Sequence, residues 1–142
     1  MKTIGLIGGM SWESSIEYYR IINQKTRQKL GGLHSAKSLM YSVEFADIEN
    51  LQHQNRWEDA ANILIEAARS LEKGGADFAL ICTNTMHKLY DEVQAKIKIP
   101  LLHISGCTRG SHKKKRHGPD RITGHPLYHG GRFLQRPTDR KI

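Results

Sequence analysis

The chain has 142 residues, of which 38% are hydrophobic, enough for one domain with a sizeable core. Its first apolar run ends at Gly8-Gly9, too early for a secretion signal or a membrane span, and two cysteines are too few for a disulfide framework. We therefore expect a cytoplasmic protein with no membrane partner.

The net charge of +8 is distributed unevenly. Residues 1–105 carry equal numbers of basic and acidic side chains, so the whole excess lies in residues 106–142. This tail is rich in glycine and histidine and has few, scattered apolar residues, so it cannot build a core. The sequence thus predicts an ordered domain over 1–105 and an irregular, disordered basic tail over 106–142.

Strand and helix patterns alternate over the first 105 residues. A short apolar strand at 2–7 precedes a helix that Ser14 and Glu17 would open as a capping box and Gly31-Gly32 would end. Apolar residues of that helix fit one face: Ile16, Tyr19, Ile22 and Leu30. A second strand is expected at 38–45.

The clearest helix spans 57–72 and ends at Gly74-Gly75. Its apolar stripe consists of Ala60, Ile63, Leu64, Ala67, Ala68 and Leu71. A third strand at 78–81, a third helix at 87–97 and a fourth strand at 101–104 follow. This repeated order predicts an α/β fold, with an open parallel sheet flanked by helices on both faces, Rossmann-like or flavodoxin-like.

Unusual residues gather where the predicted strands end. Gly8 to Ser11 follow the first strand, Glu44 the second and Cys82 to Thr85 the third. Ligands of open parallel sheets bind beyond the carboxyl ends of the strands, so these segments predict a site. No G-x-G-x-x-G motif is completed, so a dinucleotide site is not expected.

Cys82 is the candidate reactive group. At the start of a helix, unpaired backbone N–H groups and the helix dipole would lower the pKa of its thiol toward neutrality. The same N–H groups, with Thr83, Asn84 and Thr85, could hold a carboxylate. The alternative is a buried structural cysteine, with Asn84 or Thr85 as an ordinary helix cap.

Several motifs together resemble the aspartate/glutamate racemase family. They are G-L-I-G-G-M-S-W-E-S from Gly5, Tyr18-Tyr19 with Asn23, Leu51-Gln52 before Trp57, A-D-F-A-L-I-C-T-N-T-M-H from Ala76, and P-L-L-H-I from Pro100. Their order and spacing match the family over nearly all of residues 1–105. The resemblance implies a cofactor-independent, metal-free racemase made of two similar α/β halves, with an amino acid held between them and one catalytic cysteine from each half.

The resemblance also assigns roles to residues. Cys82 corresponds to the first catalytic cysteine, and Thr83, Asn84 and Thr85 would hold the substrate carboxylate. Met10 and Gln52 match positions that line the pocket, although Met10 could simply belong to the core and Gln52 to a solvated loop. Trp57, Tyr18 and Tyr19 are expected to pack rather than to react.

Inverting an α-carbon without a cofactor requires a thiolate on one face and a thiol on the other. Cys107 lies in a segment that matches no part of the family's second half, so we do not expect it to be the second thiol. We therefore expect the chain to be a truncated racemase with negligible activity. Which amino acid it would take cannot be read from this half, and family members commonly form dimers.

A shift of the reading frame would account for the composition of the tail. If its codons are read one nucleotide later, Arg121 to Gly131 permit G-L-L-G-T-P-F-T-M-E-E, and the codons that follow permit D-F-Y-K-G-R-L-T-E. Those residues resemble the opening of the family's second half. Residues 106–142 are therefore hypothesised to be an out-of-frame reading that begins near Ser105.

The competing interpretation assumes that the tail is read in its correct frame. A basic, glycine-rich tail could bind nucleic acid through phosphate contacts and make the chain a non-catalytic binding module. The tail has neither interleaved aromatic residues nor a nucleic-acid motif, and its four histidines are a poor zinc pattern, so this interpretation is the weaker one.

Overall fold

The computed structural model describes residues 1–106. In chain order the elements are β1 Ile4–Gly8, α1 Trp12–Leu30, β2 Ser38–Ser42, α2 Phe45–His53, α3 Trp57–Lys73, β3 Phe78–Ile81, the 3₁₀ helix η1 Thr85–Leu89, α4 Tyr90–Gln94 and β4 Leu101–Leu102. The predictions for residues 107–142, namely disorder, an out-of-frame origin and nucleic-acid binding, lie outside the described residues.

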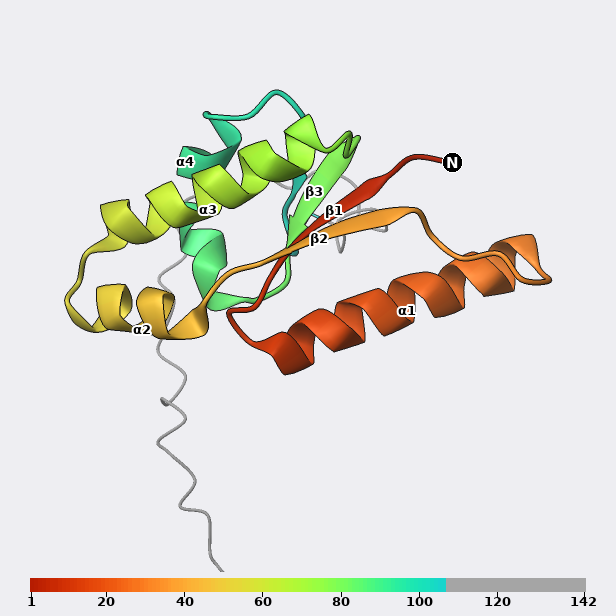
Figure 1. Ribbon diagram of the computed structural model, residues 1–142, viewed down its shortest axis with the longest axis horizontal. Helices are drawn as coiled ribbons and strands as arrows, with labels where there is room; N and C mark the ends of the chain where they lie inside the picture. The colour runs from red at the N-terminus through yellow and green to blue at the C-terminus, as the bar shows by residue number, and fades with distance from the viewer. Residues whose placement is uncertain (107–142) are drawn as a thin grey trace, which may run out of the picture. The chain divides into compact units, whose positions relative to one another are not determined.

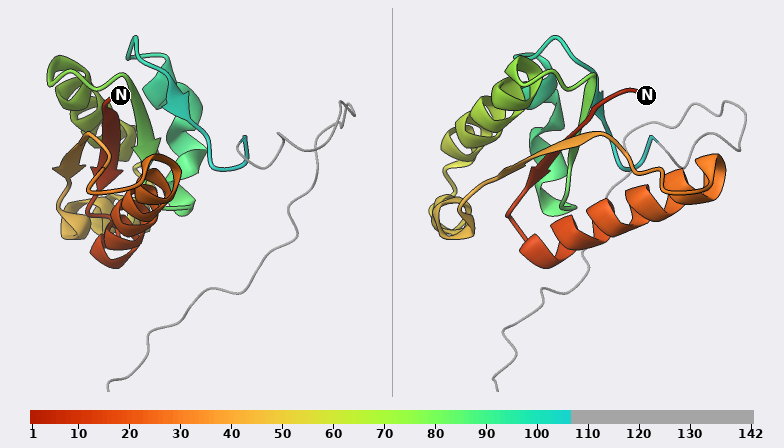
Figure 2. Two further views of the ribbon diagram at one scale, coloured as in Figure 1. Left: turned by 90° about the vertical axis from the view of Figure 1, so that its right-hand side faces the viewer. Right: turned by 45° about the vertical axis from the view of Figure 1, so that its right-hand side comes forward.

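The strands form one parallel sheet in the order β2-β1-β3-β4. Helix α1 lies on one face, and α3 and α4 lie on the other (Figures 1 and 2). The predicted α/β class with an open parallel sheet is thus confirmed. Within residues 1–106, no helix combines the length and apolarity needed to cross a bilayer.

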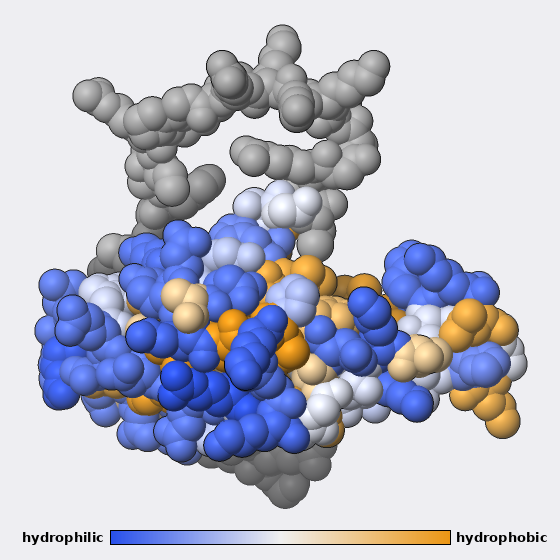
Figure 3. All heavy atoms as spheres, turned by 90° about the horizontal axis from the view of Figure 1, so that it is seen from above, coloured by the Kyte–Doolittle hydropathy of each residue, from blue (hydrophilic) through white to orange (hydrophobic). Residues whose placement is uncertain are grey.

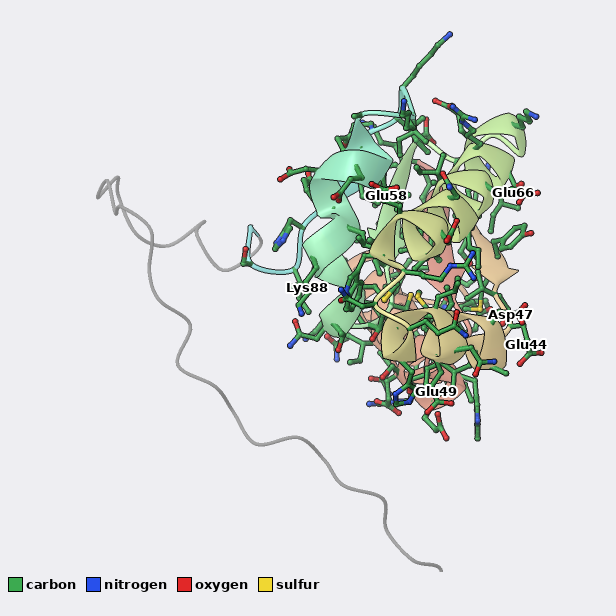
Figure 4. All side chains as sticks on the ribbon, turned by 90° about the vertical axis from the view of Figure 1, so that its left-hand side faces the viewer. Glu44, Asp47, Glu49, Glu58, Glu66 and Lys88 are labelled. Atoms are coloured by element: carbon green, nitrogen blue, oxygen red, sulfur yellow. The ribbon has the colours of Figure 1, made fainter. Side chains whose placement is uncertain are left out.

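Helix α3 supplies most of the core. Its buried residues are Ala60, Ala61, Leu64, Ile65, Ala67, Ala68 and Leu71, and Ile63 is partly buried beside them, which confirms the predicted stripe. They pack against Ile7, Ala79 and Ile81 of the sheet. From the side of α3 and α4 the surface is mostly hydrophilic (Figure 3). Acidic side chains such as Glu49 and Glu66 project outward from α2 and α3 (Figure 4).

Helix α1 differs from its prediction at its start and on its face. Ser11 caps the helix, because its side chain accepts a hydrogen bond from the Ser14 N–H, so the expected capping box at Ser14 is wrong. The end at Gly31 is confirmed. Ile16 and Tyr19 are about half exposed, and Ser15 is the buried residue of this helix, so the predicted apolar face does not enter the core of this domain.

Other elements also differ from their predictions, and the strand expected at 101–104 ends at Leu102. The expected strand at 38–45 stops at Ser42, because the side chain of Glu44 accepts a hydrogen bond from the Ala46 N–H and opens the unpredicted helix α2. The expected helix at 87–97 is split into η1 and the short α4.

Candidate functional site

The candidate site lies where β1 and β3 end side by side. From β1 the chain proceeds to β2 on one edge of the sheet, and from β3 it proceeds to β4 on the other. Such a switch in direction is where open parallel sheets bind ligands. The Cys82 N–H donates to the Ile7 carbonyl at 2.9 Å, which places the cysteine directly beside the glycine turn that follows β1.

The glycine turn is held tightly. Gly9 has φ +92°, and a Cβ added there would lie 2.2 Å from the Val43 carbonyl oxygen. The Gly9 N–H donates to Ser15 Oγ at 3.1 Å, and this hydroxyl donates to the Ser11 carbonyl at 3.0 Å. The turn after β1 is therefore fixed by α1 on one side and by the chain after β2 on the other.

Cys82 is 1% exposed, and burial raises the pKa of its thiol to about 12. The expected depression of this pKa is therefore wrong. Cys82 is followed by bends and a five-residue 3₁₀ helix rather than directly by an α-helix, so the dipole of a long helix is absent and desolvation of the thiolate dominates. The thiol is thus protonated at neutral pH in this chain.

The three polar residues that follow Cys82 become more exposed along the chain. Thr83 is half-buried, whereas Asn84 and Thr85 are exposed. Asn84 occupies the N-cap position of η1 but makes no side-chain capping bond, so capping does not account for its side chain. Their polar groups are placed where a ligand could reach them from solvent.

Gln52 and Met10 occupy different environments. Gln52, on α2, is half-buried, and its Nε2 donates to the sulfur of Met86 at 2.9 Å, so α2 and η1 meet beside the Cys82 loop. Met10 is 4% exposed and belongs to the hydrophobic core next to the glycine turn. The structure thus brings Gln52 to the loop, and it places Met10 in the core.

Sequence reasoning missed Ser15 and His87, the buried polar residues within 1–106. His87 bonds the Thr83 carbonyl through Nδ1 at 2.7 Å and receives the Ile104 N–H on Nε2 at 3.3 Å. The sequence signal that could have identified His87 is its position as the last residue of the cysteine motif, among residues with helical spacing. The three packing predictions have mixed outcomes: Trp57 packs against the core, Tyr18 is half-buried and Tyr19 is about half exposed.

Within residues 1–106, no group of three or more His, Cys, Asp or Glu side chains is arranged to hold a metal ion. Lys88 lies over the Trp57 ring, with Nζ 4.9 Å from the ring centre, and its side chain projects from the surface (Figure 4). This cation is therefore engaged with Trp57 on the outside of the domain.

Comparisons with known proteins point to one family. Residues 7–119 match the family model described as Asp/Glu/hydantoin racemase. The broad specificity amino-acid racemase RacX of Bacillus subtilis is 38% identical over 107 residues, which are 71% of this chain and 45% of RacX.

Two crystal structures are similar to about three quarters of the chain. A Yersinia pestis protein assigned to the Asp/Glu racemases is 56% identical with a TM-score of 0.75, over 76% of this chain and 47% of that one. An aspartate racemase homologue from Pyrococcus horikoshii OT3 is 33% identical with a TM-score of 0.69, over 78% and 50%. The chain therefore spans about half the length of these relatives. With four fifths of its residues covered by the family model, the chain belongs to the Asp/Glu/hydantoin racemase family.

Proposed function

We propose that this chain supplies one half of the active site of a cofactor-independent amino-acid racemase, with Cys82 as a proton-transferring thiol. The observation that carries the proposal is the bond from the Cys82 N–H to the Ile7 carbonyl, which places the thiol residue at the switch point between β1 and β3. Membership of the racemase family and the amino-acid racemase activity named for RacX support the reaction class.

The reaction needs two groups on opposite faces of the α-carbon. A thiolate removes the α-proton from one face, and a second thiol returns a proton to the other face. Because burial raises the pKa of Cys82 to about 12, its protonated thiol is suited to returning a proton in the chain as it stands. The opposing thiol would come from a second half that corresponds to the remaining length of the relatives.

The polar loop after Cys82 would bind the substrate carboxylate. Thr83, Asn84 and Thr85 offer hydroxyl, amide and backbone donors next to the thiol residue, and Asn84 and Thr85 are accessible. Removing the α-proton transfers negative charge toward the carboxylate, so donors aimed at its oxygens stabilise the enolate that forms. Gln52, whose Nε2 donates to the sulfur of Met86 on η1, would line the pocket from the side of α2.

We propose further that residues 106–142 are an out-of-frame reading of the second half, and that the chain itself is inactive. The compatible codons from Arg121 onward support this origin. Sequencing the nucleotides around codon 105 tests it: an uninterrupted frame with no family-like reading downstream rejects the proposal. Because the chemistry needs a reduced thiol, we also propose a cytoplasmic location.

The function itself is tested by following amino-acid inversion. The chain is incubated in D₂O with L- and D-aspartate, glutamate and alanine, circular dichroism measures inversion, and proton NMR measures deuterium at the α-carbon. We expect no inversion from the chain as given, and inversion from a version whose downstream frame is restored. Cys82→Ser should abolish inversion in the restored protein. Undiminished inversion in that variant would refute the role of Cys82.

A further inference from the structure

His87 links the cysteine loop to the end of the sheet. It lies on η1, five positions after Cys82, and is 9% exposed. Its Nδ1 lies 2.7 Å from the carbonyl oxygen of Thr83, the residue that follows Cys82. Its Nε2 lies 3.3 Å from the backbone nitrogen of Ile104, just after β4. One imidazole thus connects the chain segments that leave β3 and β4.

The two partners fix the protonation of this ring. A carbonyl oxygen can only accept a hydrogen bond, so Nδ1 must carry a proton toward Thr83. A backbone N–H can only donate, so Nε2 must be unprotonated to receive Ile104. His87 is therefore the neutral Nδ1–H tautomer, and both ring nitrogens are already engaged.

The surroundings favour the neutral form. Burial lowers the pKa of His87, the bond to Thr83 opposes this shift, and the neighbouring His103 lowers the pKa further. The ring of His103 meets that of His87 edge-on, with 4.8 Å between centres, and also contacts Tyr90. A proton on Nε2 would point at the Ile104 N–H and break the link to the chain after β4.

We propose that His87 is a positioning residue, which fixes the loop from Cys82 to Thr85 by bridging the Thr83 carbonyl and the Ile104 N–H. This inference rests on the proposed function, because the loop it fixes is the proposed carboxylate site. His87 acts through Thr83, since neither ring nitrogen is free to exchange a proton with a substrate. The bridge couples the thiol-bearing loop to the point where the chain leaves the fourth strand.

Two measurements on the full chain test the bridge without requiring turnover. In a Cys107→Ser background, Cys82 is the remaining thiol. Nitrogen-15 NMR of the histidine rings should show His87 as the Nδ1–H tautomer at neutral pH. The rate of Cys82 alkylation by iodoacetamide should rise about tenfold in His87→Leu, because the lost hydrogen bonds had restrained loop opening.

Matched variants separate positioning from packing. His87→Asn retains a donor toward Thr83, so its alkylation rate should stay close to the parent rate. His103→Asn removes the ring that packs edge-on against His87 but keeps both hydrogen bonds of the bridge, so it should also have little effect. An Nε2–H tautomer, a parent-like rate in His87→Leu, or equal rates in the Leu and Asn variants would overturn the proposal. If His87→Leu does not fold by circular dichroism, the tautomer and the Asn variant decide the question.

These readouts are independent of racemisation. If the inversion assay fails but the tautomer is confirmed and His87→Asn keeps the parent alkylation rate, the proposed reaction is refuted and the bridge stands. If the bridge is not confirmed but the restored protein shows Cys82-dependent inversion, the bridge is refuted and the proposed reaction stands.

Discussion

The thiol of Cys82 lies in an environment that favours its neutral form. It is 1% exposed, and burial raises its pKa to about 12, whereas a proton-abstracting thiol must ionise near neutral pH. A positively charged group or an ordered donor near the sulfur would be needed to reverse this shift. In this chain, the backbone thus places Cys82 at the candidate site, but its thiol is not ionised at neutral pH.

This ionisation state leads to a first prediction. In the Cys107→Ser chain, the rate of Cys82 alkylation by iodoacetamide should be slow at pH 7 to 8 and should keep rising beyond pH 10, since the thiolate forms only toward pH 12. Stopped-flow or mass-spectrometric rates across pH provide the profile, with the urea-unfolded chain as the reference. A plateau with its midpoint near neutrality would show that the thiol is activated.

The neutral His87 predicts how stability depends on pH. Its pKa in the folded chain is lowered, so between that value and the ordinary value of 6.5 the unfolded chain binds more protons. The free energy of unfolding should therefore fall as the pH drops below about 6.5. Urea titrations at several pH values measure this, and His87→Asn should flatten the dependence. An unchanged slope in the variant would assign the effect to other groups.

Gly9 and Gly75 form a matched pair for testing the turn after β1. Their φ angles are +92° and +91°, but an added Cβ would meet the Val43 backbone at Gly9 and nothing within 4 Å at Gly75. Gly75→Ala should cost about 1 kcal/mol from backbone strain alone. Gly9→Ala should cost about 3 kcal/mol, because the overlap adds to the strain. Urea unfolding measures both, and equal costs would contradict the close approach.

At the scale of elements, the start of α1 separates two capping schemes. Ser11 Oγ accepts from the Ser14 N–H, so Ser11→Ala should lower the free energy of unfolding by about 1 kcal/mol. Ser14→Ala is the control: the capping box expected from the sequence requires it to be as costly, whereas the structure predicts a small effect. Chemical unfolding of the two variants distinguishes the schemes.

The elements that were predictable are those whose sequence pattern agrees with their packing. Helix α3 was located closely because its apolar stripe meets a sheet that buries it. Helix α2 was missed because Glu44 caps a short helix immediately after an edge strand, a local bond that periodicity does not show. The start of α1 was misplaced because two serines compete as caps, and geometry decides between them.

The candidate site likewise combines features that the sequence pattern predicts with features that it does not. The position of Cys82 beside the glycine turn follows from strand order, so the sequence could predict it. Its raised pKa is caused by burial, which cannot be read from residue types. The bridge made by His87 spans residues 83 to 104, a contact that no local pattern contains.

At the scale of the whole described domain, one face of the sheet is covered less than the other. Strand pairing aligns four apolar residues in a row across the sheet: Met40, Leu6, Leu80 and Leu102. The residues next to them, such as Ile7 and Ala79, face the core under α3, so side-chain alternation places this row on the face of α1. Met40 and Leu102 remain 45% and 38% exposed. Parallel sheets are normally covered on both faces, so within residues 1–106 this face lacks part of its cover.

Incomplete cover predicts self-association. Helix α1 adds Trp12, Ile16 and Tyr19 to the exposed apolar surface, at 63%, 51% and 49% exposure. Such a surface favours association of copies, so sedimentation velocity should show larger species as the protein concentration rises. Ile16→Glu combined with Tyr19→Lys should shift the chain toward monomer. Phe45→Ser is the control, because it removes an exposed apolar residue from α2 and should leave association unchanged. A monomer at all concentrations, or an equal shift in the control, would show that the α1 face does not mediate contact between copies.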